Sequence, residues 1–111
     1  MKYWTVVCER LPAQGMALYP FILIKDEHRK EDVVLINHEK IHLRQQLELA
    51  IIPFYLFYLI NYLINVFRYK NHHLAYVNIL FEREAYKHER NLTYLRFRKF
   101  CEWWFSNRSR K

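Results

Sequence analysis

The hydrophobic and polar positions along the chain predict a short strand followed by helices. Residues 17–24, ALYPFILI, are an apolar run ending in β-branched residues, which is typical of a strand, and Pro20 favours a place on a sheet edge. The polar residues KDEHRKE then predict a turn. Asp32 stands where a helix N-cap is expected, before a helix from Val33 to about Ile52 that Pro53 ends or kinks.

The apolar segment 49–67, LAIIPFYLFYLINYLINVF, contains no charged residue, and its length is close to what a membrane-spanning helix needs. Pro53, Asn61, Asn65, the many tyrosines and the basic residues on both flanks oppose a span. The segment by itself therefore favours a buried core helix and a membrane helix equally. After it, residues 72–90 and 92–105 predict two further helices, the last with basic and aromatic residues interleaved.

No repeat, low-complexity run or Gly/Ser linker divides the chain, so residues 1–111 are predicted to form a single domain. Its expected class is mainly α (α+β), a compact helical domain with a short N-terminal strand region. Two cysteines, Cys8 and Cys101, match no CxxC spacing, which argues against a disulfide scaffold or a cysteine metal site. The short apolar N-terminal stretch is followed by Glu9 and Arg10, unlike a secretory signal, and the expected location is the cytoplasm.

The formal net charge of +7 favours anionic partners such as phospholipid headgroups or nucleic acid. No nucleic-acid-binding motif is present, so no specific nucleic acid is indicated. Residues 92–105 combine apolar and basic side chains as an interfacial membrane helix does, although a core-packing helix with a solvated basic face explains the same pattern. The residues concerned are Leu92, Leu95, Phe100, Trp103 and Trp104 with Arg96, Arg98 and Lys99.

The strongest chemical signal is the HExxH sequence His38-Glu39-Lys40-Ile41-His42 inside a predicted helix. Residues four apart share a helix face, so the two imidazoles can bind one metal ion. Glu39 can then reach a metal-bound water and act as a general base. Because roughly two or three chains per hundred of this composition contain such a pattern by chance, a solvated His/Glu face remains the alternative.

A catalytic zinc site needs a third protein ligand. About forty residues after the motif comes the sequence FEREAY, residues 81–86, in a predicted helix. An HExxH helix followed by a helix with ExxA resembles the gluzincin group of metallopeptidases. This resemblance implies a zincin-like fold, Zn²⁺ as cofactor, Glu82 as the third ligand, and hydrolysis of a peptide or protein substrate by a metal-activated water. Ala85 matches the small residue that lets the helices approach, whereas Tyr86 stands where many members have Asp.

Other residues compete for roles at this site. The sequence HLRQQ, residues 42–46, resembles the HxxQQ continuation of some compact zincin-like domains, and Gln46 is placed to support a ligand through its amide. Tyr86 is either a hydrogen-bond donor to a transition-state oxyanion or a packed helix tyrosine. Glu84 is an alternative third ligand that fits the motif less well. The remaining candidate ligands are His72, His73 and His88, for which surface positions are the commoner explanation.

The metal site constrains the apolar segment. A single crossing by residues 49–67 would put the HExxH motif and Glu82 on opposite sides of the membrane, where they could not share a metal ion. If the metal site is correct, the segment is therefore a core helix, lies in the membrane interface, or re-enters on the side that it left. In the last case it would form two arms, 49–52 and 54–60, bent at Pro53. The sequence therefore predicts a small zinc metallopeptidase whose aromatic surface rests on a membrane, and the resemblance implies that ALYPFILI pairs with an extended substrate. The alternative is a membrane-associated or structural protein, single-span or interfacial, without turnover.

Overall fold

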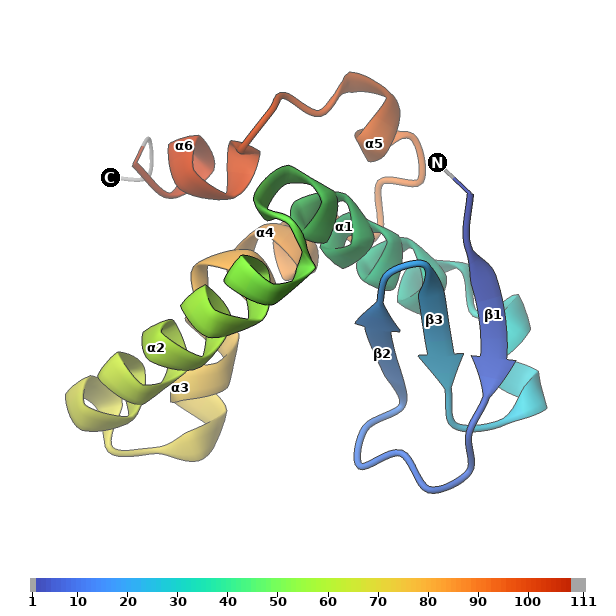
Figure 1. Cartoon of the computed structure of the whole chain (residues 1–111), viewed down its shortest axis with the longest axis horizontal. Helices are drawn as coiled ribbons and strands as arrows, with labels where there is room; N and C mark the ends of the chain where they lie inside the picture. Colours follow the sequence, from blue (N-terminus) through green and yellow to red (C-terminus); the bar gives the residue numbers. More distant parts are fainter. Residues whose placement is uncertain (1, 109–111) are drawn as a thin grey trace.

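The structure, a computed structural model, describes residues 2–108 and is mainly α-helical with one small sheet, as the sequence predicts (Figure 1). The strands are β1 (Trp4–Val7), β2 (Gly15–Leu18) and β3 (Phe21–Ile24), and a 3₁₀ helix, η1, covers Glu27–Glu31. The α-helices are α1 (Val33–Leu49), α2 (Ile51–Tyr69), α3 (His72–Val77), α4 (Leu80–His88), α5 (Tyr94–Phe97) and α6 (Glu102–Arg108).

The sheet has the order β1-β3-β2, with β3 parallel to β1 and antiparallel to β2. The single strand predicted over 17–24 is wrong, because Tyr19 and Pro20 form the turn between β2 and β3. A turn suits proline, which has no N–H to give to the ladder. The apolar residues of this hairpin pack against Leu43 of α1, so the sheet lies on the helix that carries the HExxH motif.

Helix α1 begins as predicted and ends earlier than predicted. The Asp32 carboxylate accepts a hydrogen bond from the Leu35 N–H at 3.1 Å, which confirms the N-cap. The helix ends at Leu49 because Ala50 takes a φ of 61° and a ψ of 157°, which no helix continues. Pro53 neither ends α1 nor bends the apolar segment: it lies in the first turn of α2, where a missing N–H breaks no helical hydrogen bond.

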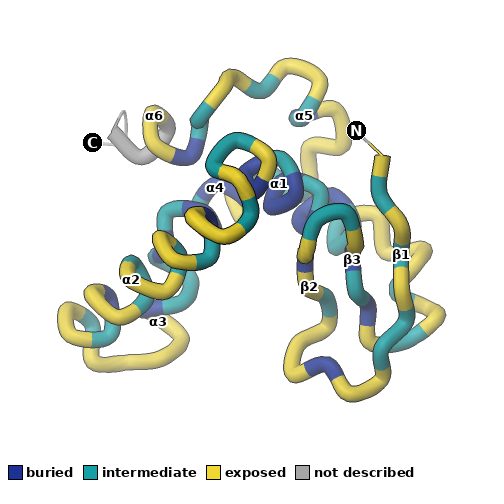
Figure 2. The backbone as a smooth tube through the Cα atoms, viewed as in Figure 1, coloured by how far each residue is buried: buried dark blue, intermediate teal, exposed yellow. Residues whose placement is uncertain are grey.

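The apolar segment is one continuous helix, α2, and not two arms bent at Pro53. It is also not a buried core helix, because Phe54 and Asn65 are its only buried residues (Figure 2). Among residues 2–108 it is the one helix long and apolar enough to cross a membrane. Helices α3 and α4 run back from its far end toward α1 (Figure 1), which brings Glu82 to the side of the HExxH motif.

Two helices predicted as continuous are each broken. Residues 72–90 form α3 and α4 with a break at Asn78 and Ile79, where the Asn61 side chain accepts from the Leu80 N–H at 2.9 Å. Residues 92–105 form α5 and the start of α6 with a non-helical stretch between them. Arg98 lies in that stretch and its side chain is buried, 1% exposed, which excludes it from any membrane-facing basic surface.

Candidate metal centre

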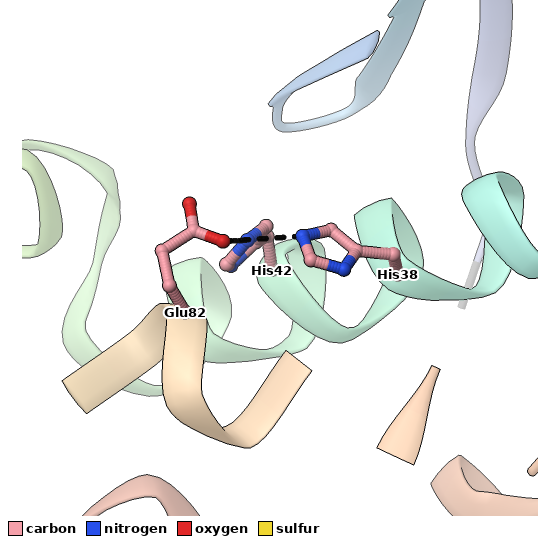
Figure 3. A group of neighbouring side chains, drawn as sticks. All are labelled: His38, His42 and Glu82. Atoms are coloured by element: carbon pink, nitrogen blue, oxygen red, sulfur yellow. Dashed lines mark hydrogen bonds and ion pairs between the residues drawn. The ribbon is translucent and has the colours of Figure 1, made fainter. Parts of the chain in front are cut away.

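His38, His42 and Glu82 converge on one point between α1 and α4 (Figure 3). The Oε1 atom of Glu82 lies 3.1 Å from Nε2 of His38 and 3.1 Å from Nε2 of His42. All three side chains are buried, and their ligand atoms lie within 4.8 Å of one another. A tetrahedral ion with bonds of about 2.1 Å holds its donor atoms roughly 3.4 Å apart. The group can therefore hold a metal ion with little movement of the side chains.

The sequence explains why two helices bring these atoms together. The histidines are one turn apart on the same face of α1, as the motif predicts. Helix α4 approaches that face closely because its residue opposite Ile41 is Ala85, and both are fully buried in one small cluster with Tyr94. The close approach that the resemblance implies for the small residue is thus present in this chain.

Each histidine is oriented by a second residue. Nδ1 of His38 lies 2.8 Å from Oε1 of Glu89, and Nδ1 of His42 lies 2.8 Å from Oε1 of Gln45. Both partners are acceptors, so each Nδ1 carries a proton and donates it. In the neutral rings the lone pairs are then on Nε2, the atoms that face Glu82. This tautomer is the one that binding of a metal at Nε2 requires.

The amide that supports a ligand is that of Gln45, not that of Gln46 as predicted. Nε2 of Gln45 donates to the Phe81 carbonyl at 3.1 Å and to Oε1 of Glu84 at 2.8 Å, which fixes its oxygen toward His42. Gln46 instead joins α1 to the hairpin. Its Oε1 accepts from the Tyr19 N–H at 2.7 Å and its Nε2 donates to the Ala17 carbonyl at 2.9 Å.

The two glutamates of the FEREAY sequence have different surroundings, and Glu82 is the one grouped with the histidines. Glu82 faces the histidines, and its second oxygen accepts from the Tyr58 hydroxyl of α2 at 2.6 Å. Glu84 faces the other way and accepts hydrogen bonds from Gln45, Tyr94 and Arg98. Arg98 also donates to Glu48 at 3.0 Å, so Glu84 belongs to a buried ionic network that ties the C-terminal part of the described chain to α1.

Glu39 lies beside the ligand group at the junction of two cavities, of about 250 Å³ and about 330 Å³. Glu39 lines both, together with Ala13, Gly15 and Tyr76. Gly15 is the only glycine in the chain. A Cβ there would lie 3.2 Å from Oε2 of Glu39, so the missing side chain lets β2 approach this carboxylate.

The other residues singled out in the sequence lie around this centre or away from it. The Tyr86 ring packs edge-on against His38 with centroids 4.6 Å apart, and Tyr86 lines the larger cavity. Among residues 2–108 the group that can hold a metal ion consists of His38, His42 and Glu82 alone. The other three candidate histidines lie elsewhere: His72 bonds Tyr62, His88 stacks on Tyr94, and His73 is exposed.

Charge and burial compete at the centre. Burial lowers the pKa of His42, but the charge and hydrogen bond of Glu82 outweigh it and raise this pKa to about 9. Burial raises the pKa of Glu82, but the two histidines outweigh it and hold this pKa well below its usual range. For Glu39, burial dominates and raises the pKa, against the opposing charges of His42 and His38. In the metal-free protein at neutral pH, His42 is therefore protonated, and a metal ion that binds must displace this proton.

Comparison of the chain with protein-family models, curated proteins and solved structures gave no match. The gluzincin resemblance therefore rests on the two motifs alone. Any function assigned to the chain has to be supported by the geometry and chemistry of the centre itself.

The residues that form hydrogen bonds with the candidate ligand side chains and orient them were not predicted from the sequence. Tyr58 and Glu89 come from other elements, and no local spacing relates either of them to the HExxH motif. Gln45 had a local signal: it lies three residues after His42, a separation at which helix side chains meet.

Replacing Gln45 and Gln46 separately tests which amide supports the centre. We expect Gln45→Met to lower the affinity for a divalent ion, with Zn²⁺ as the probe, by about 10- to 100-fold, because His42 loses the acceptor for its Nδ1–H. Gln46→Met is the matched control, since Gln46 is equally buried and also holds buried backbone groups. It should lower the free energy of unfolding but leave the affinity close to native. Equal losses of affinity in a competition titration would contradict the assignment.

The proton on His42 predicts a pH dependence of metal binding. Below a pKa of about 9 the ion must displace this proton, so the apparent affinity should rise with pH between 6 and 9 by up to about tenfold per pH unit. Calorimetry at pH 7 in two buffers of different ionisation enthalpy should detect the released proton. The variant His88→Gln, which leaves the centre intact, should behave like the native chain. An affinity independent of pH, with no proton released, would show that His42 is neutral before binding.

Proposed function

We propose that the protein is a zinc-dependent peptidase in which His38, His42 and Glu82 hold the ion. Two imidazole nitrogens and one carboxylate oxygen are a combination of donor atoms found in catalytic zinc sites. Such sites leave a fourth position for water or substrate. Histidine-rich sets with one carboxylate suit zinc better than calcium or magnesium, which prefer oxygen donors alone. The observation that carries the proposal is that a fourth buried group, Glu39, lies beside these ligands and faces cavities large enough for a substrate.

Glu39 is the residue to which we assign proton transfer. When bound, zinc would acidify a coordinated water and polarise the scissile carbonyl of the substrate. The Glu39 carboxylate takes the proton of the attacking water and passes it to the leaving amine. Burial, which raises the pKa of Glu39, brings it closer to that of a base that both accepts and returns a proton near neutrality. Glu39, His42 and Glu82 meet in the smaller cavity, so a substrate that fills this cavity would keep bulk water out of the exchange.

A tyrosine is available to stabilise the negative oxygen that forms on the substrate. Tyr86 packs on His38 at the rim of the larger cavity, and Tyr76 lines both cavities. Burial raises the pKa of Tyr86 above its usual value, so its hydroxyl keeps its proton and remains a donor at neutral pH. We assign the oxyanion role to Tyr86, whose ring lies against His38 and which is 45% exposed.

The edge of the sheet supports a peptide as the substrate. The edge strand next to the centre is β2, and its residues Gly15, Met16 and Ala17 line the smaller cavity. Gln14 pairs inward with Lys25, so by strand alternation the backbone groups of Gly15 point outward. An extended peptide that paired there would run past Glu39. The resemblance implied this role for the whole run ALYPFILI, but the Ala17 carbonyl and the Tyr19 N–H are already bonded to Gln46. The geometry therefore favours Gly15 for this pairing and not the run itself.

The substitution Glu39→Gln tests catalysis separately from metal binding. We expect the variant to keep its zinc and lose about 10²- to 10⁴-fold in turnover of a fluorogenic peptide library, because the amide cannot accept the proton. The matched control is Glu27→Gln, at an exposed residue of η1 whose carboxylate pairs with nearby Lys30. Zinc-loaded native protein without peptidase activity, or full activity in Glu39→Gln, would favour the alternative in which the site serves a non-catalytic membrane or structural protein.

A further inference from the structure

Helix α2 has its polar and apolar sides reversed relative to a helix on the surface of a water-soluble domain. The outer face, as we call it, consists of Ile52, Leu56, Leu59, Ile60, Leu63, Ile64 and Phe67, each between 48% and 83% exposed. At 100° per residue these seven positions fall within a sector of about 140°. The sector holds no polar or charged side chain, so water would meet an apolar stripe along the whole helix.

The polar side chains of α2 lie on the opposite side and are bonded within the protein. Asn65 donates to the Ala75 carbonyl at 3.1 Å, and Asn61 accepts from Leu80 N–H at 2.9 Å. Tyr58 bonds Glu82 at 2.6 Å, and Tyr62 lies 2.8 Å from His72 Nδ1. Polar groups that turn inward while apolar groups turn outward are the arrangement of a helix exposed to lipid.

The charges around the outer face fit an anionic surface. The chain has no acidic residue between Glu48 and Glu82, and exposed Arg68 and Lys70 stand at the far end of α2. On its other flank the face continues into α6, where Phe57 and Trp103 meet edge-on with centroids 5.3 Å apart. Helix α6 adds the exposed aromatics Trp104 and Phe105, and the residues just before it include exposed Lys99 and Phe100. Aromatic rings and long cations together are typical of the interface between headgroups and acyl chains.

A bilayer fits these features better than a second protein. Protein interfaces combine an apolar centre with a polar rim and interfacial hydrogen bonds, and the outer face has no polar side chain to supply either. Helix α2 is 19 residues long, about 28 Å, and is apolar on one side from its second residue to Phe67. An apolar groove of about 160 Å³ beside it, lined by Phe57, Ile60, Asn61, Ile64 and Leu80, can accept part of an acyl chain.

We propose that the outer face of α2 lies in the acyl-chain region of an anionic phospholipid bilayer, with Arg68 and Lys70 at the headgroups. The contact is one-sided, because the inner face of α2 packs on α3 and α4 and holds Glu82 through Tyr58. This inference stands whether or not the metal centre is catalytic. It goes beyond the proposed function by fixing the helix, the face and the lipid chemistry that bring the centre to a membrane.

Vesicle flotation tests the proposal with the full chain. Native protein should float with vesicles of phosphatidylcholine and phosphatidylglycerol in equal parts, and more weakly with phosphatidylcholine alone. The double variant Leu59→Asn, Leu63→Asn should bind at least about tenfold more weakly, because two side chains lose their transfer into the apolar layer. The single variant Phe67→Asn, at a position 83% exposed, should weaken binding without disturbing the packing.

The matched control is the double variant Leu18→Asn, Val33→Asn, which changes two exposed apolar residues on other faces and should bind like the native chain. Binding that survives the outer-face substitutions and disappears at high salt would overturn the proposal, because cations alone would then hold the protein. It would also be overturned by a native dimer that binds no vesicles and that Leu59→Asn, Leu63→Asn converts to a monomer. That result would assign the face to a second copy of the chain.

Discussion

One Glu82 oxygen contacts two imidazoles, 3.1 Å from each, and the whole centre is built around this contact. A buried carboxylate is tolerated only where positive charge or hydrogen bonds compensate its lost hydration, and here the compensation comes from α1 and from the Tyr58 hydroxyl. Glu89 and Gln45 fix the two rings from behind. The three ligand atoms are therefore held in place by the protein itself, which lowers the cost of ordering them around an ion.

Helix α2 links this centre to the surface of the molecule. Its inner side supplies the tyrosine behind Glu82 and the asparagines that hold α3 and α4, while its outer side is apolar throughout. A segment long enough to cross a bilayer would conflict with a metal site that needs residues from both of its ends. The one-sided contact with lipid that we propose avoids this conflict, because it would leave His42 and Glu82 on the same side of the membrane.

The fold class and the grouping of His38, His42 and Glu82 could both be predicted from the sequence, and that these residues bind a metal stays a prediction. Residues four apart in a helix share a face, and the motif that contains Glu82 pairs with the HExxH motif in a known way. The hydrogen bonds that Tyr58 and Glu89 form with these residues could not be predicted from the sequence, because no local spacing relates them to the HExxH motif. For the fold, the wrong boundaries come from backbone features that side-chain patterns hardly encode. The positive φ of Ala50 ends α1 where propensity would continue it, and the buried pairing of Arg98 with two glutamates outweighs a helical pattern over 92–105.

The metal content of the purified protein decides whether the three ligands form a zinc centre. Elemental analysis of native protein should find about one zinc per chain, because three protein ligands with a fourth position left for water make one zinc site. His42→Ala and Glu82→Ala should each lose the metal, because either change removes one of the three ligands, and His88→Ala should retain it. A folded native chain that contains no metal and takes up no added Zn²⁺, or a Glu82→Ala variant that retains the ion in full, would contradict the three-ligand centre.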